Sequence, residues 1–200
     1  KICGWSTAQI SRELKIQIYS KFKKIPKKVK LINCVGGGSS AYGFWSEFID
    51  YEKKQIELIG VEAGGPRSSK LHAAPLTNGA KLGILHGAAA YVCQNNEGQI
   101  NDTESISAGL DYPGVSPIHC FLKDTKRARY TSATDEDTLK AYQLVTKLEK
   151  IRPSLEPCHA FAEAIKIAPK LSKDTIIICN SCGDSLKDKD ILKARLGKIK

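Results

Sequence analysis

The chain has 200 residues, 42% of them apolar, and a formal net charge of +10 from 31 Lys and Arg against 21 Asp and Glu. This length suits one domain with a substantial core, and no apolar run approaches the ~20 residues of a membrane span. The surplus lysines are scattered and are not interleaved with aromatic residues, which favours a solvated basic surface over a nucleic-acid site. We expect neither nucleic acid nor a membrane as partner.

Seven cysteines, an odd number, are distributed along the chain, several of them inside apolar segments. Buried free thiols in a reducing cytosol explain this pattern better than a disulfide framework, so the sequence indicates a cytoplasmic protein. Cys179 and Cys182 form one CxxC pair. Because no second CxxC and no neighbouring His accompanies it, a metal or redox centre is disfavoured.

Apolar periodicity predicts alternating helices and strands. The first helix is expected to be capped by Ser6 or Thr7. Further helices are predicted at Ala41–Ile49, Thr134–Leu148, Cys158–Ala168 and Asp188–Leu196. Strands are predicted at Val29–Val35, Gln55–Glu62, Gly83–His86, Ala90–Cys93, Arg129–Ser132 and Thr175–Cys179. This order predicts an α/β fold of three layers, α/β/α, with a mostly parallel twisted sheet and helices on both faces.

A glycine-rich run, Gly36-Gly37-Gly38-Ser39-Ser40, lies between the first predicted strand and the next helix. A helix N-terminus leaves backbone N–H groups unpaired, and glycines let that backbone approach an anion closely. The run therefore indicates a phosphate cradle, although tight packing alone also produces such turns. It lacks the Lys of a P-loop and the spacing of a dinucleotide fingerprint, which disfavours nucleoside triphosphates and NAD.

Three further polar residues are expected near the same edge of the sheet. In an open parallel sheet, ligands gather at the carboxyl ends of the strands. Glu62 and Ser181 each end or follow a predicted strand, and Glu156 precedes a predicted helix. The sequence thus places them beside the glycine-rich run.

Several motifs occur in the order found in one enzyme family. They are CVGGGSSA at 34–41, LIGVEAGG at 58–65, SAGLDYPGV at 107–115, the Pro-x-Leu-Glu-x-x-His-Ala run at 153–160 and Asp-Lys-Asp-Ile at 188–191. Together they resemble the carboxyl-terminal half of the tryptophan synthase beta subunit, a fold type II enzyme that depends on pyridoxal 5'-phosphate (PLP). The SAGLDYPGV run is the most specific of them.

The resemblance implies roles for matching residues. The family's phosphate loop corresponds to Gly36, Gly37, Gly38, Ser39 and Ser40, with Ser40 standing where the family usually has Asn. In the family a serine, rather than a carboxylate, faces the pyridine nitrogen of the cofactor. Because a hydroxyl does not stabilise a pyridinium, the ring is a weaker electron sink, which suits β-replacement.

By the same resemblance, that serine is Ser181, Glu156 lies near the ring face, and Asp111 meets the hydroxyl end of the amino-acid substrate. The backbone carbonyls of Gly36, Tyr112 and Gly114 correspond to a monovalent-cation (Na or K) site. His159 is expected to be a core or capping histidine.

The resemblance implies that residues 1–200 form a single domain, the C-terminal cofactor-phosphate-binding domain of a PLP-dependent lyase. The N-terminal half with the Schiff-base lysine is absent, and the chain contains no Met, so we interpret it as a piece of a longer protein. The parent would condense L-serine and indole to L-tryptophan through a PLP aminoacrylate, in tryptophan biosynthesis. Its expected partners are the missing half, a second beta chain in a homodimer and an alpha subunit. The fragment alone is expected to be inactive.

Two alternatives remain open. One is another β-replacing enzyme, such as a cysteine or threonine synthase; the other is a non-catalytic module that binds a phosphate ligand. The sequence also departs from the family after Ser181, where the family continues Gly-Arg-Gly-Asp-Lys-Asp. Here residues 182–190 read CGDSLKDKD, which is longer and lacks the Arg.

Overall fold

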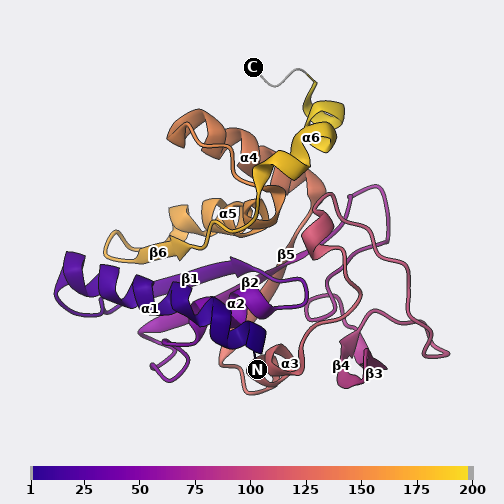
Figure 1. Ribbon diagram of the computed structural model, residues 1–200, viewed down its shortest axis with the longest axis horizontal. Coiled ribbons are helices and arrows are strands. Elements are labelled where there is room, and N and C mark those ends of the chain that lie inside the picture. The colour runs from indigo at the N-terminus through magenta and orange to yellow at the C-terminus, as the bar shows by residue number, and fades with distance from the viewer. Residues whose placement is uncertain (1, 198–200) are drawn as a thin grey trace.

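The computed structural model describes residues 2–197, with side chains from residue 6 onward. At its centre is a four-stranded, fully parallel sheet in the order β5-β2-β1-β6 (Figure 1). Its strands are β1 (Val29–Cys34), β2 (Ile56–Ala63), β5 (Ala128–Ala133) and β6 (Ile176–Cys179). The predicted parallel α/β sheet is confirmed, with strand bounds within one residue of those expected.

Helices cover both faces of this sheet. One layer contains α1 (Ile2–Phe22), α2 (Ser39–Trp45) and α3 (Pro117–Asp124). On the opposite face lies α5 (Leu155–Ile167), with α4 (Asp135–Glu149) and α6 (Lys189–Leu196) packed against it (Figure 1). The three-layer arrangement predicted from the sequence is therefore confirmed.

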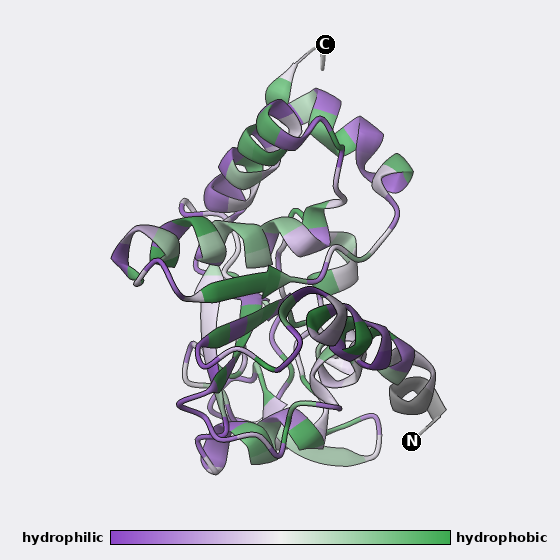
Figure 2. Ribbon diagram, turned by 90° about the vertical axis from the view of Figure 1, so that its left-hand side faces the viewer, coloured by the Kyte–Doolittle hydropathy of each residue, from purple (hydrophilic) through white to green (hydrophobic). Residues whose placement is uncertain are grey.

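Neighbouring side chains of β1 enter separate cores. Leu31 packs with Trp45 and Phe48 in the cluster under α1 and α2, whereas Ile32 packs with Ala160 of α5. Both strand residues are completely buried. Burial on both faces explains why the central strands are continuous apolar runs, which stand out between the helical layers in Figure 2.

A separate antiparallel hairpin consists of β3 (Lys81–Leu85) and β4 (Ala88–Val92). Its two-residue turn, His86 and Gly87, has positive φ at both positions, as a tight hairpin turn requires. The two short strands expected in this region are thus confirmed, and they pair with each other rather than with the main sheet.

The first helix begins before the predicted caps. Ser6 and Thr7 lie inside α1, which starts at Ile2. The Thr7 hydroxyl donates to the Ser39 carbonyl (3.1 Å) instead of capping its own helix. A Cβ on Gly43 would lie 2.2 Å from Thr7 Oγ1, so this glycine permits the close approach of α1 and α2. The capping prediction was wrong because the helix begins at Ile2, which places Ser6 and Thr7 beyond its first turn.

Two of the other helices, α2 and α5, differ from the predicted bounds by more than one residue, and one helix was not predicted. Helix α2 begins at Ser39, directly after Gly38, and ends at Trp45, followed by turns rather than the expected helix to Ile49. Helix α5 begins at Leu155, three residues earlier than predicted. Helix α3 was not predicted, because its Ser-Pro start lies within a stretch rich in helix-breaking residues.

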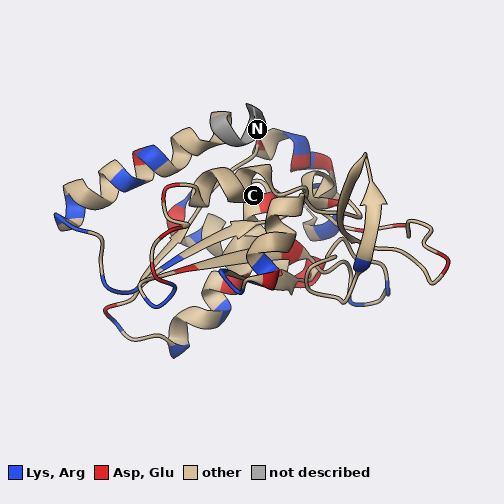
Figure 3. Ribbon diagram, turned by 90° about the horizontal axis from the view of Figure 1, so that it is seen from below, with Lys and Arg blue, Asp and Glu red and all other residues tan. Residues whose placement is uncertain are grey.

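Charged residues of both signs are distributed over the helices and connecting loops (Figure 3). Within residues 2–197, no helix combines the length and apolar character needed to cross a membrane.

Candidate functional site

The glycine-rich run forms the turn from β1 into α2, at the carboxyl end of the central strand. Helix α3 and the residue before it anchor two of its carbonyls: the Ser116 N–H donates to Gly37 O (3.0 Å), and His119 Nε2 donates to Gly38 O (2.7 Å). Gly38 has φ +97°, and a Cβ there would lie 2.2 Å from the His119 ring. Position 38 therefore requires glycine for both its conformation and its packing.

The N–H groups of the same run remain free. Within the described residues, no hydrogen bond is donated by the backbone N–H of any residue from Gly36 to Ser40. Unlike Gly38, Gly37 has open space where its Cβ would project. The turn thus presents unpaired backbone donors beside an unfilled space, as an anion site requires.

Ser40, in the first turn of α2, links three elements. Its hydroxyl oxygen accepts from Asn33 Nδ2 (3.2 Å) of β1 and from Asn180 Nδ2 (3.3 Å), which follows β6. Asn33 is completely buried, and its Oδ1 has no partner among the described residues. Ser40 therefore ties the glycine-rich run to the ends of both strands.

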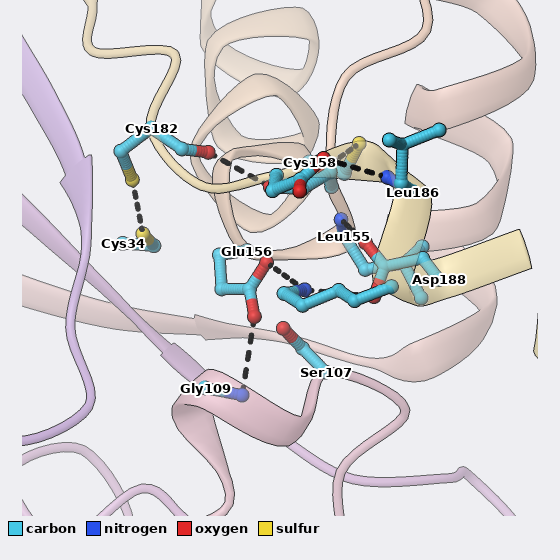
Figure 4. A network of polar contacts seen from close by, with 12 residues as sticks. Cys34, Ser107, Gly109, Leu155, Glu156, Cys158, Cys182, Leu186 and Asp188 are labelled. Carbon is cyan, nitrogen blue, oxygen red and sulfur yellow. Dashed lines mark hydrogen bonds and ion pairs between the residues drawn. The ribbon is translucent and has the colours of Figure 1, made fainter.

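Glu156 lies at the start of α5, next to the same loop. Its Oε1 accepts from the Gly109 N–H (3.1 Å), and its Oε2 pairs with Lys187 Nζ (2.7 Å; Figure 4). Burial is the largest influence on the pKa of Glu156 and would raise it, but hydrogen bonds from Lys187, from the Glu156 N–H and from Ser154, with the charge of Lys187, together hold that pKa below its usual value. The carboxyl is consequently ionised and fully engaged as an acceptor.

Gly36 and Gly109 bring the loop and Glu156 together. A Cβ on Gly36 would lie 2.9 Å from Gly109 O, and one on Gly109 would lie 2.5 Å from Glu156 Oε1. Gly109 belongs to a short 3-10 helix, Ala108–Leu110, within the SAGLDYPGV run. Beside it, the buried hydroxyl of Ser107 has no partner among the described residues.

The divergent segment after Ser181 docks on the start of α5. Ser154 Oγ donates to the Cys182 carbonyl (2.7 Å), and the Leu155 N–H donates to Asp188 Oδ2 (2.8 Å). Gly183 has φ +88°, and a Cβ there would lie 2.4 Å from Ser154 Oγ. Although the segment lacks the family's Arg, these contacts fix it in place, and Lys187 supplies a cation.

A small hollow of about 220 Å³ adjoins the glycine run. Gly37, Gly114 and Tyr112 line it together with His86, whose Nδ1 is 2.8 Å from the Tyr112 hydroxyl. The two rings are stacked, with centroids 5.7 Å apart. Tyr112 and Gly114, two of the residues expected to bind a cation, therefore lie beside the glycine-rich run.

Ser181 and Asp111 are less closely tied to this cluster. Both side chains are exposed, and neither makes a hydrogen bond or ion pair within the described residues. Ser181 nevertheless stands between Asn180 and Cys182, which do contact the cluster. The roles expected for these two residues remain predictions.

Glu62, which was expected at the same edge of the sheet, forms hydrogen bonds that hold a neighbouring loop. Its carboxylate accepts from the Leu76 N–H (2.9 Å) and from the Thr77 hydroxyl (2.6 Å). Burial raises its pKa to about 7. Glu62 thus fixes the loop that follows β2.

His119, Lys187 and Asp188 all support the site, but no role at the site was predicted for them from the sequence. His119 bonds to Gly38, 81 residues away, and Asp188 bonds to Leu155, 33 residues away, so no local sequence pattern predicts these contacts. The adjacent charged pair Lys187 and Asp188, in the segment that departs from the family, was the one sequence feature that could have indicated a role there. His159 is buried, with Nδ1 3.0 Å from its own helix at Leu155 O, as expected of a core histidine.

No group of three or more His, Cys, Asp or Glu side chains in the described part of the chain is arranged to hold a metal ion.

The fold defines a class of protein. The chain matches the crystal structure of a threonine deaminase from T.th. with a TM-score of 0.59 at 14% identity, over 89% of this chain and 56% of that one. It is therefore an α/β protein of that fold. No family model matches the chain.

Sequence comparison is more specific. The chain is 46% identical over 180 residues to the tryptophan synthase beta chain of Chromobacterium violaceum, covering 90% of this chain and 44% of that protein. It is 42% identical over 193 residues to the beta chain of Stenotrophomonas maltophilia, covering 96% and 46%. The chain is thus a relative of tryptophan synthase beta chains, as the motifs indicated. It spans a little under half the length of those relatives.

Proposed function

We propose that this chain is the C-terminal, cofactor-phosphate-binding domain of a tryptophan synthase beta chain, which joins L-serine and indole to form L-tryptophan with loss of water. The observation that carries this proposal is the 46% identity over 90% of the chain. A single domain over residues 1–200 and a cytoplasmic location belong to the same proposal.

The glycine run suits the phosphate of PLP. Its unpaired N–H groups, the open space at Gly37 and the hydroxyls of Ser39 and Ser40 form a donor set for a phosphate group. Bound PLP would supply an electron sink for negative charge that develops on the substrate. Gly36 to Ser40 would hold its phosphate, because the anchored carbonyls of Gly37 and Gly38 keep those donors directed away from the core.

Glu156, Ser181 and Asp111 would divide the remaining polar functions. Glu156 stays ionised beside Lys187 and would fix charge near the cofactor ring. Ser181, exposed after β6, would meet the pyridine nitrogen without supplying a negative charge. Asp111 would take the hydroxyl end of the amino-acid substrate, and its exposed carboxylate is available to do so.

A monovalent cation would bind at backbone carbonyls. Within the described residues, the carbonyl oxygens of Gly36, Tyr112 and Gly114 accept no hydrogen bond. Free carbonyl oxygens are suitable ligands for a hard cation, so Na or K would bind there.

The proposed function also includes protein partners. Four large apolar side chains on α1, the hairpin and α3 are mostly exposed: Ile16, Leu82, Ile84 and Phe121. Their exposure supports a further covering partner, such as the N-terminal half of the enzyme. A homodimer of beta chains and an alpha subunit complete the proposed assembly.

The experiment is an assay of tryptophan formation from serine and indole with added PLP. We expect turnover by the longer protein that includes the upstream half, and none by the 200-residue chain. Turnover by the isolated chain above a cofactor-only blank would contradict the proposed division of the enzyme. Formation of cysteine or threonine by the longer protein, without tryptophan, would favour the other synthases.

A further inference from the structure

Two thiols meet at the carboxyl edge of the sheet. Cys34 is the last residue of β1, Cys182 follows the neighbouring strand β6, and their Sγ atoms are 3.7 Å apart (Figure 4). Cys34 is buried, whereas Cys182 is partly exposed. The pair joins positions 148 residues apart in the sequence, and it does not use the CxxC partner Cys179.

The geometry allows a covalent bond with little movement. A disulfide requires sulfurs about 2.05 Å apart, and these two are already in contact. Cys182 lies in an irregular segment next to Gly183, so it can approach Cys34 more easily than a residue within a strand could. We propose that Cys34 and Cys182 form a reversible disulfide, a redox modification site two residues before the glycine run.

The surroundings assign different roles to the two thiols. A hydrogen bond from Cys34 lowers the pKa of Cys182 against the opposing effect of burial, and a hydrogen bond from Ser40 acts in the same direction. The negative charge of Glu156 raises the pKa of Cys182, but Lys187 pairs with that carboxylate and compensates its charge. Cys182 is therefore the attacking thiol, being both more exposed and more acidic, and Cys34 is the resolving thiol.

The oxidant is a low-molecular-weight disulfide such as oxidised glutathione. The Cys182 thiolate attacks one sulfur of the oxidant, which breaks its S–S bond and releases one glutathione as thiol. Cys34, whose pKa is raised first by its hydrogen bond with Cys182 and then by burial, gives up its proton as it attacks Cys182 Sγ, and the second glutathione leaves as a thiol. The protein loses two electrons and two protons, and glutathione disulfide is reduced to two thiols.

The test equilibrates the 200-residue chain with mixtures of oxidised and reduced glutathione, followed by acid quenching, alkylation and peptide mass spectrometry. We expect one linked peptide pair containing Cys34 and Cys182, lighter by two hydrogens, which dithiothreitol reverses. Alkylation of both cysteines should disappear together as the oxidised fraction rises. This outcome does not depend on whether the chain binds a phosphate.

Three variants sharpen the result. Cys182→Ser should abolish the link, and Cys34→Ser should leave a glutathione adduct on Cys182. Cys179→Ser is the matched control, because Cys179 lies in β6 outside the pair, and it should keep the link. If Cys34→Ser does not fold, Cys182→Ser, at a partly exposed site, still decides the matter. Full alkylation of both thiols in every mixture, or a link from Cys182 to Cys179, would overturn the proposal.

Discussion

His119 Nε2 donates a hydrogen bond to the Gly38 carbonyl across 2.7 Å, and this contact joins helix α3 to the glycine-rich turn. On its other side, Nδ1 accepts from the Tyr130 hydroxyl at 2.8 Å, which fixes a neutral tautomer. Burial lowers the pKa of His119 to about 4, in keeping with that neutral form. The imidazole thereby holds the carbonyl side of the turn and leaves its N–H side free.

Replacing His119 by Ala should remove both hydrogen bonds and leave a cavity beside Trp45. We expect the free energy of unfolding to fall by about 2–4 kcal/mol. Denaturant titration measures this loss. Phe121→Ala, an exposed aromatic change on the same helix, should stay within about 0.5 kcal/mol. Equal effects of the two variants would show that His119 does not anchor the turn.

Glu62 should make stability depend on pH. The pKa of Glu62 in the folded state is about 7, above its ordinary value, because burial favours the protonated form. The stability that this protonated carboxyl contributes is therefore fully present below about pH 4.5 and is lost as the pH rises through 7. Glu62→Gln has no such loss. Between pH 4.5 and neutral pH, the free energy of unfolding of the parent should therefore fall by up to about 3 kcal/mol relative to that of this variant.

Comparing the two proteins at each pH cancels the contributions of the buried histidines. Glu97→Gln, an exposed change, is the control and should run parallel to the parent. A constant difference between the parent and Glu62→Gln across this range would mean that Glu62 titrates normally.

Asp188→Ala should loosen the divergent segment. The Asp188 carboxylate accepts from the Leu155 N–H at the start of α5 and also pairs with Lys187. Its loss leaves a buried N–H without an acceptor, so the free energy of unfolding should fall by about 2 kcal/mol. The exposed Asp190→Ala should cost less than about 1 kcal/mol. Thermal or denaturant unfolding distinguishes them, and identical midpoints would argue against docking of the segment.

Ser181→Asp tests the proposed contact with the pyridine nitrogen in the longer protein. A negative charge beside a cationic nitrogen raises its pKa, which should strengthen the electron sink and favour side reactions. We expect a shifted cofactor absorption spectrum and a lower ratio of tryptophan to by-product. Ser20→Asp, on the exposed side of α1, should change neither. A spectrum and product ratio equal to those of the parent would show that Ser181 does not reach the ring.

Periodicity was a good guide to the sheet and to the long helices. The runs of β1 and β2 are buried on both faces of a parallel sheet, and this burial explains their continuous apolar sequences. Strand β6 lies at the edge of the sheet and is half-buried, but its run of three isoleucines was equally clear. Helix α4 was equally clear, because Thr134 and the acidic residues after it form a capping pattern. Helix α3 was missed since proline and glycine dominate the stretch before it.

Contacts between distant residues were harder to foresee. The pairs His119 with Gly38, Asp188 with Leu155 and Cys34 with Cys182 are separated by 81, 33 and 148 residues. No local periodicity encodes such pairs, because they arise from strand order and loop docking. The glycine run was identified from the sequence, whereas the side chains that support it required the structure.

The central claim, that the glycine run holds the cofactor phosphate, is tested most directly by titrating the chain with inorganic phosphate and with PLP, followed by calorimetry. Gly37 has ordinary φ and open space at its Cβ, so Gly37→Asp should fold normally and repel the phosphate. We predict binding by the parent, at least about tenfold weaker binding by Gly37→Asp, and unchanged binding by Ser20→Asp, which adds the same charge elsewhere. Equal affinity of the parent and Gly37→Asp, or no binding by the parent, would contradict the claim.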